Sequence, residues 1–513
     1  MWLDYVILGL YAVSMVFIAL YTRKKSKSVN DFMFAGKKGL NGWMSAFSYG
    51  TTYFSAVIFI GYAGKFGSSY GLAAVWIGIG NALLGSLVAW KLMAKRTKNM
   101  TQRLSAKTMP EFFEKRYDSK ALKLLSAIVI FTFLIPYSAS VYNGLGSLFK
   151  IVFGINNTWI IMVALAVLTA LYLVFGGYFA TALTDFIQGI IMLIGIIAMV
   201  FCFLNSAEVG WNLSDLTSDV NKTWFTFNST NKGFYGSTVS LISLILLTSM
   251  GVYGLPQTVH KYYAVRDKKA IMQGMVVSTI FALIIGFGAY FSGALSGLFN
   301  LGSIHSDDII PTMIAKVIPM GLIGIITVLM LSASMSTLAS VSLSSASVVT
   351  IDIYKGRVNK KATDKQVSFV MRLFCLIFVL ISLALAILNE KYKLAAIAYL
   401  MGVSWGTLSG CFFGPFVIGL MWKKVSKSSV WASIIGSLVL TVVLIILLGY
   451  DINSFNCSFG TAIQSGITCS PTIGVICIFY SILVTFVVSL FTRKPSKEVI
   501  DEAFNKQIDN LAL

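Results

Sequence analysis

The stretch "YGTTYFSAVIFIGYAG", residues 49–64, is apolar enough to enter a membrane, yet glycine and hydroxyl side chains interrupt it. A second stretch, "SMGVYGLPQT" at 249–258, is interrupted in the same way by two glycines and a proline. Glycine weakens a helix, and proline removes one of its hydrogen bonds. In lipid the freed carbonyl groups must be satisfied by a neighbour, a water or an ion. We therefore expect two broken membrane helices, and their places in the chain decide the fold.

Apolar runs make up most of the remaining chain. Of the 513 residues, 57% are hydrophobic and only 12% are charged, against about 25% charged residues in soluble domains. A run of about 18 apolar residues forms a helix long enough to cross the roughly 30 Å core of a bilayer. We predict an all-α integral membrane protein with about 13 transmembrane helices, at 3–21, 44–64, 71–94, 121–148, 158–175, 182–204, 236–256, 270–298, 318–349, 369–388, 394–421, 429–449 and 472–491.

The two broken spans are the second and the seventh of this series. If the first span is set aside, they become the first and sixth helices of a core made of two five-helix units. An odd number of helices inverts the second unit, which is the arrangement of inverted-repeat secondary transporters. The alternative is ordinary glycine-mediated helix packing. We expect a single polytopic domain over 1–513, with an extra helix and cytoplasmic loop at 1–43, repeats at 44–204 and 236–421, and peripheral helices with a cytoplasmic tail at 422–513.

Positive charge lies mainly on one predicted side of the membrane. The net charge is +20, and the basic loops include "KRTKNMTQR" (95–103), "YKGRVNKK" (354–361) and "TRKPSK" (492–497). The positive-inside rule places these loops in the cytoplasm, with the N-terminus outside and the C-terminus inside a plasma membrane. Contact with anionic lipid accounts for the charge without a nucleic-acid partner.

Signatures of pumps and enzymes are missing from the sequence. No GxxxxGK[ST] motif occurs, and His260 and His305 are the only histidines, so neither ATP binding nor a histidine-dependent catalytic or metal cluster is indicated. We predict no enzymatic activity and no metal other than sodium. Cys457 and Cys469 fall in one predicted external loop, where a disulfide can form.

A hydroxyl-rich helix is predicted at "MLSASMSTLASVSLSSASVVT", residues 330–350, which holds eight serines and two threonines. Ser336 and Thr337 follow Ala333 at helical spacing, so their oxygens share one face. Hard oxygens of this kind suit a hard cation. The alternative is that the small residues let helices approach closely and bond back to their own helix. Asp185 also falls within a predicted span, where a carboxylate is a candidate functional group unless it lies at the helix end and reaches water.

Four motifs together resemble the sodium:solute symporter family, which has the LeuT-type fold, and the resemblance covers nearly the whole chain. They are "TTYFSAVIFIG" (51–61), "TMPEFFEKRY" (108–117), "GGYFATALTDFIQG" (176–189) and "SMSTLAS" (334–340). The resemblance implies that Na+ is the coupling ion. It also implies a sodium site made of the carbonyls of Thr51, Phe54 and Ala333 and the hydroxyls of Ser336 and Thr337.

A second cation site is left open by the same resemblance. Some members hold a second sodium with a serine pair and an aspartate. Here Asp185 and Ser340 are present, but Ala339 stands where such members have serine. Coupling to protons through Asp185 is the alternative use of this carboxylate.

The solute is expected to be small and to carry a carboxylate. Sugar-carrying members have polar residues where this chain has Val57, Ile58 and, approximately, Gly78. The motifs look more like the pantothenate, monocarboxylate and proline branches, in which a small carboxylate lies between the broken helices, and a helix N-terminus suits an anion. The candidate lining residues are Ser55, Ala56, Tyr137, Tyr253 and Gln257; the alternative for each aromatic is plain packing.

These observations predict a secondary active Na+-coupled symporter that imports a small organic solute by alternating access. The alternatives are a proton-coupled or uncoupled facilitator, or a sugar or sialic-acid carrier of the same family. One Na+ driven by ~100 mV and a tenfold gradient supplies about 3.7 kcal/mol, enough for roughly 500-fold accumulation of a zwitterion but only about tenfold for a monoanion. The expected partners are the solute, sodium and lipid, with the oligomeric state left open.

Overall fold

The computed structural model describes residues 2–22, 33, 39–214, 216, 223–225, 238–392 and 394–505. Throughout these residues the regular structure is helical, and pairing of extended backbone is limited to one isolated bridge. Ten helices are long and apolar enough to cross a membrane, or up to eleven if one bent pair counts as a span. The predicted all-α membrane class is therefore confirmed. Most of the basic loop after the first span and of the predicted external loop at 206–235 lies outside the described residues.

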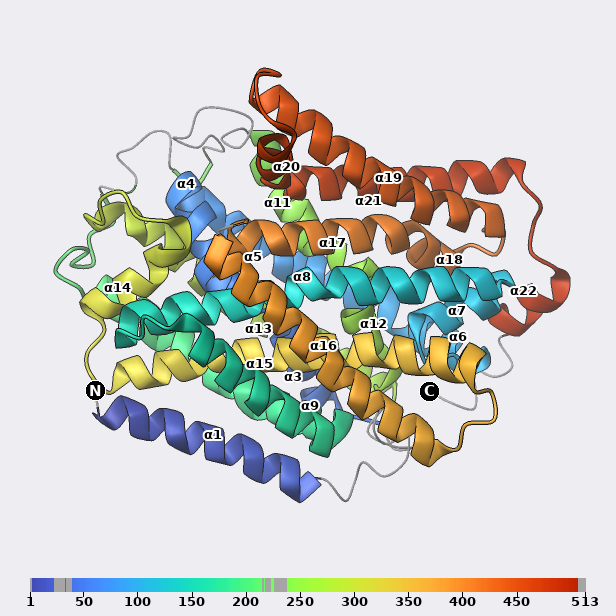
Figure 1. The fold of residues 1–513 in the computed structure, drawn as a ribbon, viewed down its shortest axis with the longest axis horizontal. Helices are drawn as coiled ribbons and strands as arrows, with labels where there is room; N and C mark the ends of the chain where they lie inside the picture. Colours follow the sequence, from blue (N-terminus) through green and yellow to red (C-terminus); the bar gives the residue numbers. More distant parts are fainter. Residues whose placement is uncertain are drawn as a thin grey trace.

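Long helices lie side by side along the longest axis of the molecule (Figure 1). Their burial separates an inner from an outer set: 89% of the most apolar window of the α15 span is buried, against 22% in α1 and 28% in α19. An apolar surface on the outer helices suits contact with lipid. The long helices are α1 (Trp2–Thr22), α8 (Lys120–Phe153), α9 (Thr158–Leu204), α13 (Lys268–Leu295), α15 (Leu322–Ser347), α16 (Asp364–Tyr392), α17 (Ile397–Phe413), α19 (Lys427–Ile452) and α21 (Ser470–Phe491).

The first predicted break is present in the structure. Helix α3 (Gly42–Tyr53) ends at Phe54, whose backbone is extended (φ −104°, ψ 113°), and helix η2 (Val57–Gly67) begins after Ala56. The chain then runs through α4 (Ser68–Tyr70), η3 (Gly71–Ala74), α5 (Val75–Gly80), η4 (Asn81–Val88), η5 (Trp90–Ala94) and α6 (Lys95–Arg103). Short helix α7 (Met109–Tyr117) follows before α8.

The second predicted break is also present, but the span does not end there. Helix α11 (Thr238–Met250) leads through η7 (Gly251–Gly254) to Leu255, which is extended, and α12 (Pro256–Tyr263) continues at an angle of 49°. The predicted span stopped at 256 because a proline and the polar run "QTVHKYY" end the apolar pattern. The helix that follows nevertheless folds back into the protein, where all eight of its residues are buried.

The predicted spans 158–175 and 182–204 form the single element α9, with Gly177 as its one non-helical residue (φ 61°, ψ −164°). A positive φ is strained for residues with a Cβ, so glycine is required at this sharp kink. The six-residue gap expected between these spans is thus reduced to a single-residue break.

Two hydrogen-bonded contacts connect elements that are distant in sequence. The N–H of Leu40 donates to the Ala264 carbonyl (2.8 Å), and the N–H of Arg266 donates to the Leu40 carbonyl (3.1 Å), which joins the start of α3 to the end of α12. At the other end of the bundle, Asp4 of α1 accepts backbone N–H bonds from residues 321 and 324 at the start of α15. Asp4 is therefore a second buried carboxylate within a predicted span.

Short helices lie at both ends of the bundle. Basic helix α6 lies at the same end as α7 and α22 (Lys497–Phe504), whereas α14 (Ile309–Val317) and α20 (Phe459–Ile467) lie at the other end (Figure 1). Cys457 and Cys469, at this second end, are separate thiols in the structure.

Candidate cation and solute site

Oxygens of the predicted sodium residues meet where α3 ends against α15. The Ser336 hydroxyl lies 3.0 Å from the Thr51 carbonyl and 3.0 Å from the Ala333 carbonyl. The Thr337 hydroxyl lies 3.0 Å from the Ala333 carbonyl and 3.4 Å from that of Thr51. All four residues are fully buried. Two helices thus bring two hydroxyls and two carbonyls, all uncharged, to one point, and oxygens of this kind suit a hard monovalent cation.

Phe54, the remaining predicted sodium residue, terminates α3. Its N–H donates to the Gly50 carbonyl (3.1 Å), and its extended backbone turns its own carbonyl away from the helical direction. A carbonyl at a broken helix end needs a partner other than the next turn. The break therefore provides a further oxygen close to Thr51 in the chain.

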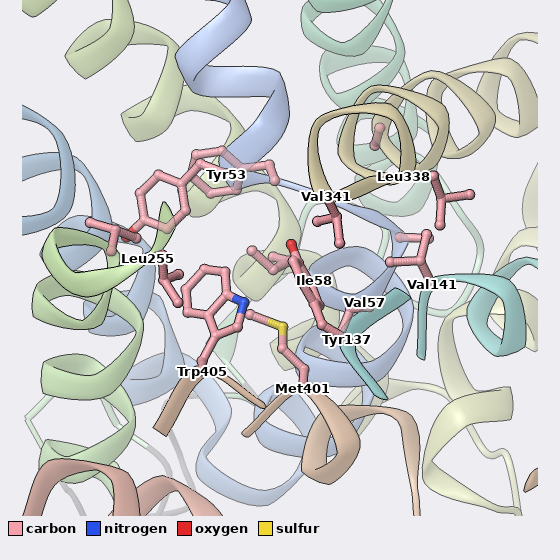
Figure 2. Packing of buried hydrophobic residues seen from close by; sticks show 14 of the residues in the cluster. Tyr53, Val57, Ile58, Tyr137, Val141, Leu255, Leu338, Val341, Met401 and Trp405 are labelled. Carbon is pink, nitrogen blue, oxygen red and sulfur yellow. The ribbon is translucent and has the colours of Figure 1, made fainter. Parts of the chain in front are cut away.

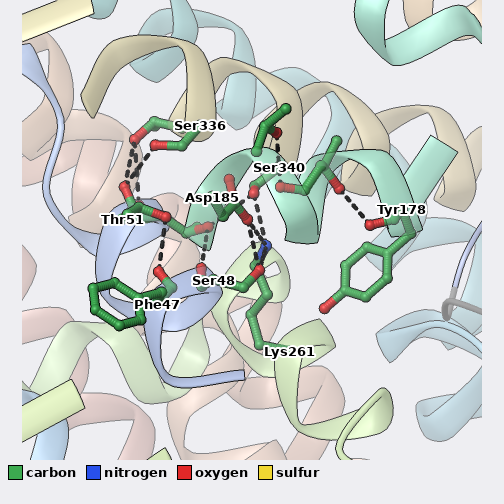
Figure 3. A network of polar contacts seen from close by, with 12 residues as sticks. Phe47, Ser48, Thr51, Tyr178, Asp185, Lys261, Ser336 and Ser340 are labelled. Carbon is green, nitrogen blue, oxygen red and sulfur yellow. Dashed lines mark hydrogen bonds and ion pairs between the residues drawn. The ribbon is translucent and has the colours of Figure 1, made fainter. Parts of the chain in front are cut away.

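The residues of the candidate second cation site, Asp185 and Ser340, both contact the ammonium group of one lysine, Lys261 (Figure 3). The Lys261 Nζ donates to the hydroxyls of Ser48 and Ser340, each at 2.9 Å, and lies 3.5 Å from Asp185 Oδ2. The Ser48 hydroxyl also donates to Asp185 Oδ2 (2.6 Å). The side chains of Lys261 and Asp185 are 3% and 0% exposed, so this is an ion pair in the interior of the bundle.

Lys261 is a residue that sequence reasoning missed. It belongs to α12, beyond the proline at which the predicted span ended. Its ammonium also lies 5.2 Å from the centroid of the Tyr178 ring, within the range of a cation–π contact. The sequence did contain a hint, because Lys261 is a single lysine a few residues after the second break and does not belong to a cluster of basic residues.

Tyr137 is the predicted solute residue that most directly joins the sodium residues. Its hydroxyl is buried near the side chains of Ser55 and Thr337 and has no hydrogen-bond partner among the described residues. Its ring packs edge-on against Trp405, with centroids 5.6 Å apart. Figure 2 shows Tyr137 and Trp405 next to an apolar wall that includes Val57, Ile58, Met401 and Leu255. The first break therefore borders a small mixed region of hydroxyls, aromatic rings and aliphatic groups.

The other predicted solute residues divide into two groups. Ala56 lies at the first break and packs beside Gly144 of α8. Gln257 is buried at the second break, and within the described residues its Oε1 has no hydrogen-bond partner. Tyr253 instead donates its hydroxyl to the Leu84 carbonyl (2.6 Å) and stacks on Phe413. The structure thus gives Tyr253 partners within the protein, whereas Gln257 keeps a polar atom whose burial is costly unless a ligand or water satisfies it.

A separate cavity of about 270 Å³ opens at the end of the bundle where α17 begins, and polar side chains from the ends of α8 and α16 line it. Asp307 accepts a hydrogen bond from the Ile397 N–H (3.2 Å) in its wall. Burial raises the pKa of the Asp307 carboxyl above its ordinary value, against the opposing effect of His305. This cavity is distinct from the two breaks.

The family model of the sodium:solute symporter family matches residues 32–436. The chain belongs to the sodium:solute symporter family. The High-affinity proline transporter PutP of Bacillus subtilis is 28% identical over 97% of this chain and 100% of its own length. The Osmoregulated proline transporter OpuE of the same organism is 28% identical over 83% of this chain and 86% of its own length.

A solved structure has the same fold. It is described as the substrate-bound outward-open state of a Na+-coupled sialic acid symporter, with a TM-score of 0.74 and 19% identity over 96% of this chain and 99% of that one. The family resemblance drawn from the motifs is therefore confirmed, and the fold is LeuT-like. The protein is a membrane transporter rather than an enzyme, and it couples the movement of a small solute to Na+.

Proposed function

We propose that this symporter imports a small zwitterionic amino acid, with L-proline as the first candidate, by alternating access. Two relatives that align over most of the chain are named proline transporters. With one Na+ in each cycle, a zwitterion could be accumulated roughly 500-fold but a monoanion only about tenfold, so strong uptake would favour the zwitterion. Pantothenate-like and monocarboxylate solutes are the alternatives that the experiments below distinguish.

The proposed sodium site consists of the carbonyls of Thr51, Phe54 and Ala333 and the hydroxyls of Ser336 and Thr337. The observation that carries this proposal is the convergence of four of these oxygens, from two helices, within 3.0–3.4 Å. The two hydroxyls donate to the carbonyls of Thr51 and Ala333, so these buried groups have partners within the protein itself.

The proposed solute site lies between the two breaks and uses Ser55, Ala56, Tyr137 and Gln257. Tyr137 faces both Ser55 and Thr337, so the same side chain borders the solute and the sodium. Tyr253 was expected to line the site; its bond to Leu84 and its stacking on Phe413 favour a supporting position in the wall. A compact solute fits the apolar surface beside Trp405 better than a ring of hydroxyls does.

Coupling follows from the position of the sodium oxygens. Na+ would join the end of α3 to α15 and, through Thr337, order the neighbourhood of Tyr137. A ligand shifts a conformational equilibrium only by its difference in affinity between the states, and the effect between two sites is reciprocal. Sodium binding therefore raises solute affinity, and solute binding raises sodium affinity by the same factor.

The finer topology is also part of the proposal. We propose thirteen spans: the ten apolar helices, the bent pair α11–α12, a second half of α9, and a further span from dividing Val57–Arg103 at Gly71, so that η2 joins α3. They consist of a first helix, two inverted five-helix repeats within 44–204 and 236–421, and two further helices. The one-sided basic loops then put the N-terminus outside and the C-terminus in the cytoplasm of a plasma membrane.

The sodium site is tested by Ser336→Ala in proteoliposomes containing the purified protein. We expect Na+-stimulated uptake of L-proline to fall to background. Ser334→Ala is the matched control, because Ser334 is an equally buried serine on the same helix whose hydroxyl bonds back to Met330 of its own helix (2.7 Å). Equal Na+ dependence in the two variants would refute the site assignment.

The solute is tested by thermal unfolding of the detergent-purified protein, since a bound ligand raises the apparent stability. L-proline, pantothenate, lactate and sialic acid are compared in Na+ and in K+. We expect L-proline to raise the unfolding temperature in Na+ only. If only another of these solutes stabilises the protein, that solute replaces L-proline in the proposal, and the proposed sodium site is unaffected.

A further inference from the structure

The cluster around Lys261 is not used by the proposed sodium or solute sites. Its ammonium group lies at the meeting point of four helices, contacting Ser48 of α3, Asp185 of α9 and Ser340 of α15 while itself belonging to α12 (Figure 3). The Lys261 side chain is 3% exposed and its carboxylate partner is 0% exposed. Its charge is therefore buried in the bundle and does not belong to the solvated surface.

The oxygens around the ammonium have the composition of a cation site. Ser48 and Ser340 offer hydroxyls and Asp185 offers a carboxylate, and the Thr52 hydroxyl lies 2.8 Å from that of Ser340. Hydroxyl and carboxylate oxygens are the ligands that hard cations prefer. The second carboxylate oxygen, Asp185 Oδ1, is buried and lacks a hydrogen-bond partner among the described residues, so the cluster has an oxygen to spare for an ion.

The Lys261 cluster lies next to the proposed sodium site. Ser340 lies three residues after Thr337 on α15, and Thr52 follows Thr51 on α3. At a rise of 1.5 Å per residue, the two cation positions are about 5 Å apart along α15. A carboxylate inside a membrane protein needs an opposite charge nearby, and Lys261 supplies it from within the chain.

We propose that the ammonium group of Lys261 permanently occupies the second cation position, formed by Ser48, Asp185 and Ser340, so that the transporter binds a single Na+ in each cycle. This inference rests on the proposed sodium site at Ser336 and Thr337 for that one ion. It extends the proposed function to the coupling ratio: one solute and one positive charge enter together.

A merely structural ion pair makes a different prediction. If Lys261 only holds helices together, shortening it leaves a gap and no new ion. If it occupies a cation position, shortening it exposes the oxygens of Asp185, Ser48 and Ser340 to Na+. Lys261→Ala creates that space, whereas Lys261→Met keeps an uncharged chain of similar length in it and serves as the matched control.

The test is equilibrium binding of radiolabelled Na+ to the purified full-length protein, without solute. We expect one Na+ per protein in the wild type and in Lys261→Met, and two in Lys261→Ala. Adding Asp185→Asn to Lys261→Ala should return the value to one. Size-exclusion chromatography and thermal unfolding report whether each variant is folded.

Two results would overturn the proposal: two Na+ bound by the wild type, with one lost in Asp185→Asn, or a folded Lys261→Ala that still binds one. If Lys261→Ala does not fold, Lys261→Ser, which also shortens the side chain and removes the charge, takes its place, and it should likewise bind two Na+. Two Na+ in the wild type overturn the proposal whichever variant folds. Whether the proposed sodium site at Ser336 and Thr337 is correct is tested separately, by Na+ binding to Ser336→Ala. That variant should bind no Na+, and Ser336→Ala with Lys261→Ala should bind one, at the position that the lysine has left.

Discussion

The two proposed cation positions lie one helical turn apart on α15, and they are built from different groups. Around Ser336 and Thr337 the contacts are neutral hydroxyls and carbonyls that bond to one another. Around Ser340 there is a carboxylate with an ammonium beside it. Neutral oxygens can lose an ion and remain satisfied, whereas a buried carboxylate left alone is costly. An exchangeable ion therefore suits the uncharged position, whereas a fixed carboxylate needs a partner that does not leave.

The largest expected effect is a loss of stability when the buried Asp185 carboxylate is removed. Asp185→Asn leaves the Lys261 ammonium buried without a counter-charge, which should destabilise the protein by about 3–5 kcal/mol. Thermal unfolding in detergent measures this loss. Asp185→Asn combined with Lys261→Met removes both charges and should recover most of the stability. If the double variant were as unstable as the single one, the charge pairing would not be the cause.

At the neutral position the expected change is in sodium affinity rather than in stability. Thr337→Ala removes one of the hydroxyls, so the Na+ concentration for half-maximal L-proline uptake should rise at least about tenfold, or 1.4 kcal/mol. Thr337→Ser keeps the hydroxyl and should stay close to the wild type. A similar rise in both variants would assign the effect to packing of the threonine methyl group.

A smaller effect is expected for Ser340→Ala, one turn further along α15. The variant removes one acceptor of Lys261, and a hydrogen bond to a charged group contributes about 1.5–3 kcal/mol. The unfolding temperature should fall by less than in Asp185→Asn, while half-saturation by Na+ in uptake assays stays unchanged. A shift in sodium affinity as large as that of Thr337→Ala would mean that the two positions share one ion.

The smallest effect is expected for Ala339→Ser, which adds a hydroxyl next to Ser340. While Lys261 fills the position, this oxygen gains no ion, and radiolabelled Na+ binding should stay at one per protein. The same substitution in a Lys261→Ala background should tighten binding of the second Na+. Two ions in Ala339→Ser alone would show that the missing serine, rather than the lysine, sets the ratio.

The sequence was sufficient for the features that depend on local pattern. The apolar runs predicted a helical membrane protein, and the glycines and proline marked both breaks. The spacing of Ser336 and Thr337 after Ala333 placed their oxygens on one face, and the family resemblance paired them with Thr51. The membrane class, the breaks and the shared face could be predicted because each rests on helical periodicity or on backbone chemistry within a few residues, whereas the pairing with Thr51 came from the family resemblance.

What the sequence could not predict depends on contacts between distant segments. Lys261 lies beyond the point where hydropathy ends the span, and only the tertiary fold returns α12 to Asp185. Tyr253 belongs to the expected motif, but its direction is set by Leu84 and Phe413. The predicted gap between the two halves of α9 was six residues long, whereas the structure breaks the helix at Gly177 alone. In each case a local pattern was overridden by packing.

The backbone pairing of Leu40 with Ala264 and Arg266 constrains how the broken helices move. It joins the start of α3 to the end of α12. Any conformational change that preserves these bonds therefore moves both half-helices together as a rigid body. Independent movement of either half-helix would have to break them. Because the bonds use only main-chain atoms, most substitutions leave them intact. Proline at 40 or 266 is the exception, because each removes one of the two N–H donors. Both substitutions together would remove the backbone connection between the two half-helices.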